Sequence, residues 1–262
     1  MTKRAILIIG HGSRYEYNEV TIDEHRNRLE NRGYENVYIG FNETSHPFIG
    51  EAMIQMAKDG IEEVVAIPFF ITAGRHTIEQ IPKKLGLKDN ENDTYVEFEG
   101  RRIMMHYGDP FGDDPVLAEI IRDRINEART HRKIGILVIG HGSRLPYNKR
   151  TIEITAQRLM DMGFDNVRFA FNEFDKPCIE DEMRKLMLTD VDEILVTPLF
   201  ISLGDHLKND VPTKIDVGTS TGRKERPEGK SVKVKYLQPI GRDIRLTEAF
   251  VTKIEKYYGV RE

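Results

Sequence analysis

The sequence predicts an α/β protein made of two tandem duplicated domains, each with a small parallel sheet of about four strands flanked by helices. The segment Ile6–Arg14 returns as Ile136–Arg144, and the constant offset of 130 residues continues far beyond it. A repeat of this length is a duplicated domain and not a short solenoid unit. In both copies, short apolar runs alternate with helical stretches, which is typical of a buried parallel sheet. The predicted domains are therefore 1–131 and 132–262.

The first copy supplies the order of the elements. Its short apolar runs predict four strands, at 4–9, 37–41, 64–70 and 103–106. Its helical patterns predict helices at 15–32, 47–60 and 113–129, and a loop with a short helix at 74–85. Gly33 is suited to the C-cap of the first helix, and Pro47 to the first turn of the second. The polar stretch 88–99 reads as a surface loop or an irregular hairpin. The second copy repeats this order.

Composition excludes several classes of function. Hydrophobic residues make up 39% and charged residues 31% of the chain, which suits a globular protein with a core. A net charge of −4, with both signs mixed throughout, gives no support to a nucleic-acid partner. One cysteine, Cys178, can form neither an internal disulfide nor an iron–sulfur cluster. No apolar run approaches the roughly 20 residues of a membrane span, and no signal sequence opens the chain, so we expect a cytoplasmic protein.

Chemistry-bearing residues follow three of the predicted strands. His11, Glu43 and His76 each lie in a turn directly after a strand. Because the carboxyl ends of parallel strands meet at one edge of a sheet, we expect these side chains to lie together. By the repeat, His141, Glu173 and His206 form a matching set. Two imidazoles and a carboxylate suit a divalent transition metal or proton transfer.

The other four histidines have no histidine at the matching position of the other copy. They are His25, His46, His106 and His131. We expect these four to be surface residues or polar groups with ordinary hydrogen-bond partners. Phe41 and Phe171 are expected in the core.

The turn after the first strand has the features of an anion site. Gly12 and Gly142 allow the backbone to approach a ligand closely. Ser13 and Ser143 lie where a helix begins, so their simplest role is the N-cap. The same helix N-terminus, with Arg14 or Arg144 beside it, attracts carboxylates. These four residues are therefore candidates for substrate binding, although the arginines also suit a charged surface. Asn18 and Asn148 suit either the inner face of the helix or a ligand contact.

Other reaction classes fit the motifs less well. The His-Gly-Ser-Arg turn lacks the glycine two residues after serine that a nucleophile elbow requires. The chain has neither a Gly-x-Gly-x-x-Gly turn nor a Walker loop, so no nucleotide cofactor is expected. A phosphohistidine enzyme would place an arginine directly before its histidine, where this chain has glycine.

Taken together, the motifs resemble the class II sirohydrochlorin chelatases. The resemblance rests on the strand followed by Gly-His-Gly-Ser-Arg, on the Phe-x-Glu strand end, and on the segment Pro-x-Phe-x-x-x-Gly-x-His-x-x-x-x-x-Pro. It covers about 4–82 and 134–212, and it extends to the closing strand and helix. The chain resembles the long form of this family, in which two domains are fused into an intramolecular pseudo-dimer that is expected to be a monomer.

The resemblance implies an active cleft between the two domains that holds sirohydrochlorin, a flat tetrapyrrole rich in carboxylates. It implies a lyase-class enzyme for which the divalent metal is a substrate, most often cobalt in cobalamin-type biosynthesis. Two histidines of each half, His11 with His76 and His141 with His206, would bind or deliver the metal. Glu43 and Glu173 would assist deprotonation as further catalytic residues.

Three alternatives stay open at this stage. Nickel and ferrous iron accept the same ligands, so the residues do not choose the metal. A non-catalytic metal or tetrapyrrole carrier would use the same histidine pairs without turnover. A hydrolase would use Ser13 or Ser143 as nucleophile and would need no metal. The sequence also leaves open which of the two histidine pairs is active, because both halves keep one.

Overall fold

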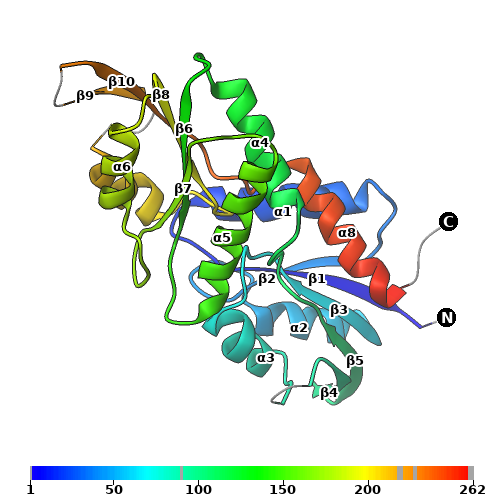
Figure 1. Ribbon diagram of the computed structural model, residues 1–262. Helices are drawn as coiled ribbons and strands as arrows, with labels where there is room; N and C mark the ends of the chain where they lie inside the picture. Colours follow the sequence, from blue (N-terminus) through cyan, green and yellow to red (C-terminus); the bar gives the residue numbers. More distant parts are fainter. Residues whose placement is uncertain (1, 89–90, 217–220, 227–228, 259–262) are drawn as a thin grey trace. The chain divides into compact units, whose positions relative to one another are not determined.

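A computed structural model describes residues 2–88, 91–216, 221–226 and 229–258, and it follows the predicted alternation of strands and helices (Figure 1). The first half contains β1 (Arg4–Gly10), α1 (Glu16–Glu30), β2 (Val37–Phe41), α2 (Ile49–Lys58), β3 (Glu63–Pro68), a π-helical turn (His76–Gln80), α3 (Ile81–Lys84), β4 (Asp93–Phe98), β5 (Arg101–Tyr107) and α4 (Val116–Ala128). The predicted strands and helices occur in the predicted order, and the structure adds the strand β4 and the π-helical turn.

The second half repeats these elements. It contains β6 (Ile134–Gly140), α5 (Pro146–Asp161), β7 (Val167–Phe171), α6 (Ile179–Met187), β8 (Glu193–Pro198), a π-helical turn (His206–Asp210), α7 (Val211–Ile215), β9 (Thr221–Glu225), β10 (Ser231–Tyr236) and α8 (Ile244–Tyr258). The duplication seen in the sequence is therefore a duplication of structure.

Each half forms a five-stranded sheet, with the orders β2-β1-β3-β5-β4 and β7-β6-β8-β10-β9. The predicted small sheet with flanking helices is confirmed, but each sheet has five strands because the polar stretch before β5 forms a hairpin. In that hairpin β4 pairs antiparallel with β5, while the other neighbouring strands of the sheet are parallel. An antiparallel strand at the edge of a parallel sheet is a common addition.

One predicted boundary shifts for a physical reason. Pro47 was expected in the first turn of a helix, but α2 begins at Ile49. The carbonyl oxygen of Pro47 accepts a hydrogen bond from the Phe41 N–H at 2.8 Å, which keeps Pro47 extended beside the end of β2. The helix therefore begins only after this contact.

The compact units of the molecule differ from the halves of the repeat by one helix each. One unit contains 1–112 and 242–262, and the other contains 113–241. Thus α8, from the end of the chain, packs with α1 and β3, whereas α4 packs with α5 and β8. The division into 1–131 and 132–262 describes the repeat, and as a division into domains it stays a prediction.

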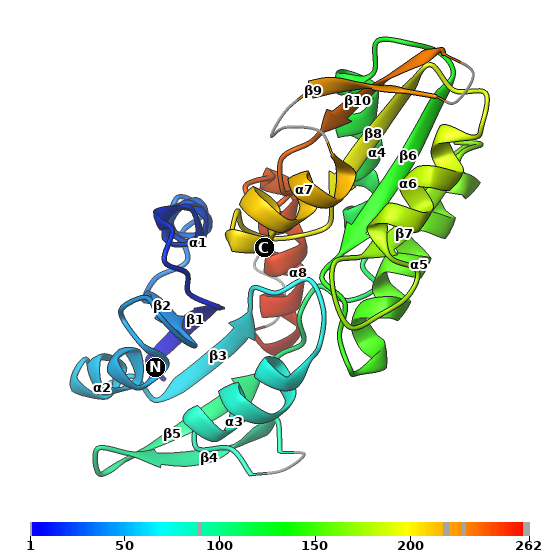
Figure 2. The same cartoon turned by 90° about the vertical axis from the view of Figure 1, so that its left-hand side faces the viewer.

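The core of the first unit has two layers, one on each face of the sheet. Alternate residues of β1 point to opposite faces, and Ala5, Leu7 and Ile9 join the cluster beneath α2 and α3. Figure 1 shows α2 and α3 on one side of this sheet and α1 and α8 on the other. Figure 2 shows the strands of the same sheet between these layers. Helices on both faces account for the wholly apolar β1.

The strand order also locates the ligand-binding edge. From β1 the chain moves outward to β2 and then crosses to β3 on the other side of β1. The point between β1 and β3 is therefore a topological switch point, where open α/β sheets form a crevice at the carboxyl ends of their strands. The turn containing His11 follows β1, and the loop leading to His76 follows β3.

No helix in the described part of the chain is long and apolar enough to cross a membrane.

The placement of α8 in the first unit predicts the effect of a substitution. Phe250 of α8 is 1% exposed, and its ring centre lies 5.7 Å from that of Phe69 after β3. We expect Phe250→Ala to lower the free energy of unfolding by about 3–5 kcal/mol. The control, Ile244→Ala, removes a side chain of the same helix that is 55% exposed, and it should change stability by no more than about 0.5 kcal/mol. Chemical denaturation measures both; equal effects would contradict the packing described for α8.

Candidate metal centre

The turn after β1 passes so close to the turn after β2 that Gly12 has no room for a side chain. Its φ is +90°, and a Cβ built on it would lie 1.6 Å from the carbonyl oxygen of Glu43. Gly142 repeats this arrangement, with φ of +88° and a Cβ position 1.7 Å from the Glu173 oxygen. The sequence predicted a close approach to a ligand at these glycines, but the close approach that the structure shows is to a neighbouring turn of the chain.

Backbone hydrogen bonds join the same two turns. The Asn42 N–H donates to the Gly10 oxygen and the Glu43 N–H donates to the His11 oxygen, both at 2.9 Å. The equivalent pair in the second unit, from Asn172 and Glu173, has the same lengths. The backbone therefore fixes the position of each histidine relative to the glutamate of the next turn.

Asn18 and Asn148 hold the glycine turn from the helix side. The Asn18 Oδ1 accepts a hydrogen bond from the Gly12 N–H at 3.3 Å, and Asn148 does the same for Gly142 at 2.9 Å. Both asparagines are buried. Of the two roles open at the level of sequence, the inner face of the helix is the one that the structure shows.

The prediction that Ser13 and Ser143 are N-caps is wrong. Helix α1 begins at Glu16 with Tyr15 at its N-cap, and α5 begins at Pro146 with Leu145 at its N-cap. The Ser13 Oγ instead accepts a hydrogen bond from the Tyr15 N–H at 3.2 Å, and the same contact in the second unit is 3.1 Å. The helix N-cap lies two residues after each serine. The serine hydroxyls therefore stabilise the turn that precedes the helix, and not the first turn of the helix itself.

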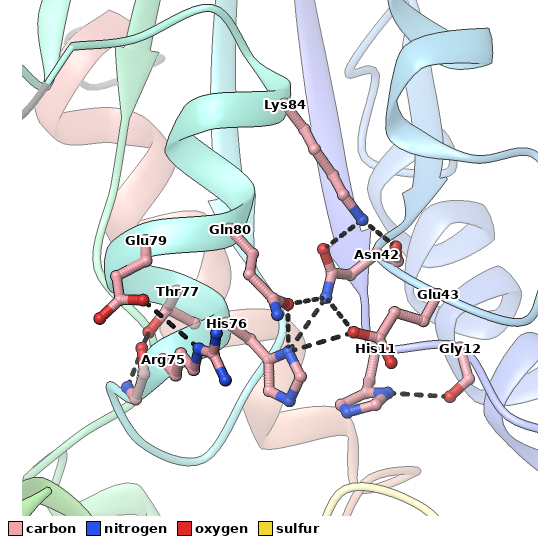
Figure 3. A network of polar contacts seen from close by, with 11 residues as sticks. His11, Gly12, Asn42, Glu43, Arg75, His76, Thr77, Glu79, Gln80 and Lys84 are labelled. Atoms are coloured by element: carbon pink, nitrogen blue, oxygen red, sulfur yellow. Dashed lines mark hydrogen bonds and ion pairs between the residues drawn. The ribbon is translucent and has the colours of Figure 1, made fainter.

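Figure 3 shows the histidine pair of the first unit with its polar neighbours. The ring centres of His11 and His76 are 4.6 Å apart, and the rings meet edge to face. The Glu43 Oε1 lies 3.6 Å from the Nδ1 of His76. The three residues that the sequence placed at one sheet edge are thus brought together.

Hydrogen bonds define which ring nitrogen of His76 faces the open side of the site. Its Nδ1 lies 2.7 Å from the Gln80 Oε1, an acceptor, and 3.1 Å from the Asn42 Nδ2, a donor, so this nitrogen is engaged by the polar cluster in either tautomer. In the tautomer that donates to Gln80, the lone pair of the neutral imidazole lies on Nε2. In Figure 3 this second nitrogen points away from the hydrogen-bonded cluster, as does the corresponding nitrogen of His11, whose Nδ1 lies 3.1 Å from the Gly12 oxygen. Both rings therefore present a potential metal ligand on the same side.

The sequence analysis missed two residues of the network, Asn42 and Lys84. The Lys84 ammonium, a pure donor, contacts the Asn42 backbone oxygen and lies 2.9 Å from its Oδ1. This contact turns the Asn42 Nδ2 toward the site, where it donates to the Gln80 Oε1 at 3.0 Å. Asn172 and Lys214 repeat the arrangement. The signal was available, because Lys84 and Lys214 keep the offset of the repeat.

The second unit contains an equivalent cluster. The ring centres of His141 and His206 are 4.7 Å apart, and the Glu173 Oε1 lies 3.6 Å from the His206 Nδ1. Each of these three residues offers a ligand atom, and the three atoms lie within 4.8 Å of one another. Within the described ranges, this is the one group of three that meets the spacing of a metal site.

The acceptor of the second histidine differs between the two clusters. Where His76 meets the Gln80 amide, the Nδ1 of His206 lies 2.6 Å from the Oδ2 of Asp210. Hydrogen bonding to His206 is the largest cause that holds the pKa of the Asp210 carboxyl below its usual value, while partial burial opposes it. Asp210 is thus a carboxylate, with a formal charge that Gln80 does not have.

The predicted arginines differ in their surroundings. Arg14 is exposed. The Arg144 guanidinium lies 5.6 Å from the ring centre of Phe174, which is 61% exposed and stacks on the His141 imidazole with centres 6.2 Å apart. Thr44 occupies the position of Phe174 in the first unit. An apolar ring and a cation therefore lie beside the second histidine pair.

The four unrepeated histidines have ordinary polar partners, as predicted. Their Nδ1 atoms pair with Thr247 for His25, Glu51 for His46, Asp93 for His106 and Thr130 for His131. Phe41 and Phe171 are 3% and 1% exposed, which confirms their place in the core.

Comparison with known proteins identifies relatives of both halves. The profile of the family described as CbiX matches twice, over 5–128 and over 135–257. A sirohydrochlorin cobaltochelatase of Methanopyrus kandleri is 35% identical over 140 residues, covering 47% of this chain and 96% of the relative. One from Methanosarcina barkeri is 33% identical over 128 residues, covering 48% and 97%. Each of these relatives thus corresponds to about half of this chain.

Solved structures show the same fold over the whole chain. SirB from Bacillus subtilis with Fe3+ has a TM-score of 0.74 at 19% identity, covering 97% of this chain and 95% of that chain. SirB from Bacillus subtilis subspecies spizizenii in complex with cobalt has a TM-score of 0.70 at 18% identity, covering the same shares. These likenesses support the fold and its two-part architecture.

The close approach at Gly12 predicts that an alanine substitution there destabilises the protein more than the same substitution at Gly33. Gly33 also has a positive φ, of +83°, but a Cβ there would meet nothing within 4 Å. Gly33→Ala should therefore lower the free energy of unfolding by only about 1–2 kcal/mol, which is the cost of placing alanine in a left-handed backbone conformation. Gly12→Ala should cost more, because the turn after β2 must move, and it should also weaken Co²⁺ binding at the first site. Denaturant unfolding and metal titration measure the pair, and equal behaviour of the two variants would contradict the role assigned to Gly12.

Proposed function

The chain belongs to the CbiX family, and we propose that it is a chelatase that inserts a divalent metal ion into sirohydrochlorin. The observation that carries the proposal is the pairing of two imidazoles beside a carboxylate at the switch point of each sheet. In the first unit the ring centres are 4.6 Å apart, with Glu43 3.6 Å from His76. Relatives that each cover about half of this chain are named sirohydrochlorin cobaltochelatase. This agreement between chemistry and family supports the substrate.

The reaction is an exchange of a metal ion for two protons. Sirohydrochlorin loses two pyrrole N–H protons, and the metal forms bonds to the nitrogens that held them, so charge is conserved. The Nε2 atoms of a histidine pair receive the hydrated ion and pass it to the ring. Glu43, or Glu173 in the second unit, accepts a proton as the N–H bond breaks. The metal is a substrate here, and the reaction requires no redox step and no nucleotide.

The carboxylates of the substrate would be bound at the glycine turns. Arg14 and Arg144 supply cations there, and guanidinium groups pair well with carboxylates. The hydroxyls of Ser13 and Ser143 accept a backbone hydrogen bond, which leaves each O–H able to donate. The proposed substrate-binding role of these four residues therefore rests on the cations and hydroxyl donors that they supply beside the glycine turns.

We propose Co²⁺ as the metal and a cobalamin-type product, with the chain acting as a monomer whose halves form an internal pseudo-dimer. The names of the relatives support cobalt. Ni²⁺ and Fe²⁺ accept the same imidazole and carboxylate ligands, so relative rates decide between the metals.

An anaerobic absorbance assay tests the proposed reaction. The protein is mixed with sirohydrochlorin and, separately, with Co²⁺, Ni²⁺ or Fe²⁺, each beside a protein-free control. We expect a metal-dependent spectral shift faster than the control, and fastest with Co²⁺. A shift produced by the tetrapyrrole alone, with no faster insertion, would indicate a carrier. No response to either ligand would exclude the chelatase.

Substitutions separate the chelatase from a serine hydrolase. The paired variant His11→Ala/His141→Ala removes one imidazole from each cluster and should reduce insertion to the rate of the protein-free control. The control Ser13→Ala/Ser143→Ala should retain most of the rate, because the hydroxyls act only in binding. The opposite pattern, with the serine variant inactive and metal not required, would identify a hydrolase.

A further inference from the structure

The two histidine clusters share one frame and differ at the group that holds the inward ring nitrogen. In both, a lysine orients an asparagine whose amide lies 3.1 Å from the Nδ1 of the second histidine. The remaining contact comes four residues after that histidine, within the π-helical turn. It is the neutral amide of Gln80 in the first unit and the carboxylate of Asp210 in the second.

Burial differs slightly between the two clusters, because His11 and Glu43 are exposed whereas His141 and Glu173 are half-exposed. The side chains of His76 and His206 are both 37% exposed, and those of Glu43 and Glu173 are 45% and 36% exposed. Solvent screening is therefore somewhat weaker at the second cluster. The formal charge of the acceptor is the electrostatic difference that directly contacts the second histidine, and exchanging the acceptors isolates it from other differences such as Arg75 against Asp205.

A carboxylate acceptor strengthens metal binding at the other side of the same imidazole. When a cation binds Nε2, the ring becomes more positive and its Nδ1–H becomes a better donor. A charged acceptor gains more from this change than a neutral one, because charge-assisted hydrogen bonds are roughly twice as strong. Carboxylate partners of metal-binding histidines also fix the tautomer and the ring orientation, and losing them typically costs about 10–100-fold in metal affinity.

The neutral acceptor of the first cluster, the Gln80 Oε1, also accepts hydrogen bonds from two donors at once. The Gln80 Oε1 receives the His76 Nδ1–H at 2.7 Å and the Asn42 amide at 3.0 Å. Asp210 offers two oxygens and a formal negative charge, and its Oδ2 lies 2.6 Å from the Nδ1 of His206. The second cluster is also the group whose three ligand atoms lie within 4.8 Å of one another.

We propose that the two clusters are not equivalent: the second, with His141, Glu173 and His206, captures the divalent metal more tightly, and Asp210 is the positioning residue responsible. Gln80 leaves the first cluster as the weaker site. The inference rests on the proposed function for the identity of the cargo, although it concerns metal capture before any tetrapyrrole is bound.

The experiment measures each cluster alone in the full-length chain. His141→Ala/His206→Ala leaves the first cluster intact, and His11→Ala/His76→Ala leaves the second. Both variants are titrated anaerobically with Co²⁺, without tetrapyrrole, and binding is followed by cobalt absorbance. We expect the second cluster to bind Co²⁺ about 10–100-fold more tightly than the first. Equal affinities, tighter binding at the first cluster or no binding at the second would overturn the proposal.

Exchange of the acceptors provides the matched control. Asp210→Asn, made where only the second cluster remains, keeps the size of the side chain and should weaken Co²⁺ binding about 10–100-fold. Gln80→Asp, made where only the first cluster remains, should strengthen binding by a similar factor. A residue with a merely structural role would not produce this gain. Unchanged unfolding midpoints show that both variants fold, and failure of Gln80→Asp to gain affinity would overturn the role of the carboxylate.

The insertion assay on the same variants separates this inference from the proposed function. Tighter Co²⁺ binding at the second cluster, with no insertion into sirohydrochlorin by the unsubstituted protein, would refute the function and keep the asymmetry. Insertion by the unsubstituted protein, with equal Co²⁺ affinity at the two clusters, would keep the function and refute the asymmetry.

Discussion

The candidate site depends on the absence of a side chain at Gly12. With a Cβ position 1.6 Å from the Glu43 oxygen, any other residue would force the turns after β1 and β2 apart. Their contact allows the Glu43 N–H to reach the His11 oxygen, and it sets the starting point from which the Glu43 side chain extends toward His76. Because Gly142 is constrained in the same way by Glu173, the constraint belongs to the frame that the two units share.

Much of this frame could be predicted from the sequence because both halves of the repeat carry the residues that form it. The apolar runs gave the strands, and the rule that parallel strands end at one edge brought His11, Glu43 and His76 together. The repeat then distinguished these residues from histidines such as His25, which is buried against Thr247 and has an ordinary polar partner. A single copy would have offered no such comparison.

What the sequence left unpredicted depends on contacts that a repeat does not report. Similarity shows which segments are alike, but not which segments pack together, so the placement of α8 beside α1 was not foreseen. The sequence analysis did not single out Lys84, because its role in orienting Asn42 becomes visible only when both side chains are placed. Ser13 was assigned to the helix because a cap and a preceding turn require the same residue type at nearly the same position.

Duplication explains why the two clusters can differ while the frame stays the same. The frame is made of buried groups, such as Asn18 and Asn42, whose replacement would leave polar backbone or side-chain atoms without partners and would cost stability. The acceptor of the second histidine lies in a half-exposed turn, where a change between Gln80 and Asp210 alters charge with little effect on packing. Such a position can vary at low cost to folding. Divergence of the two copies is therefore expected to concentrate where it changes the affinity for a cation and leaves the fold intact.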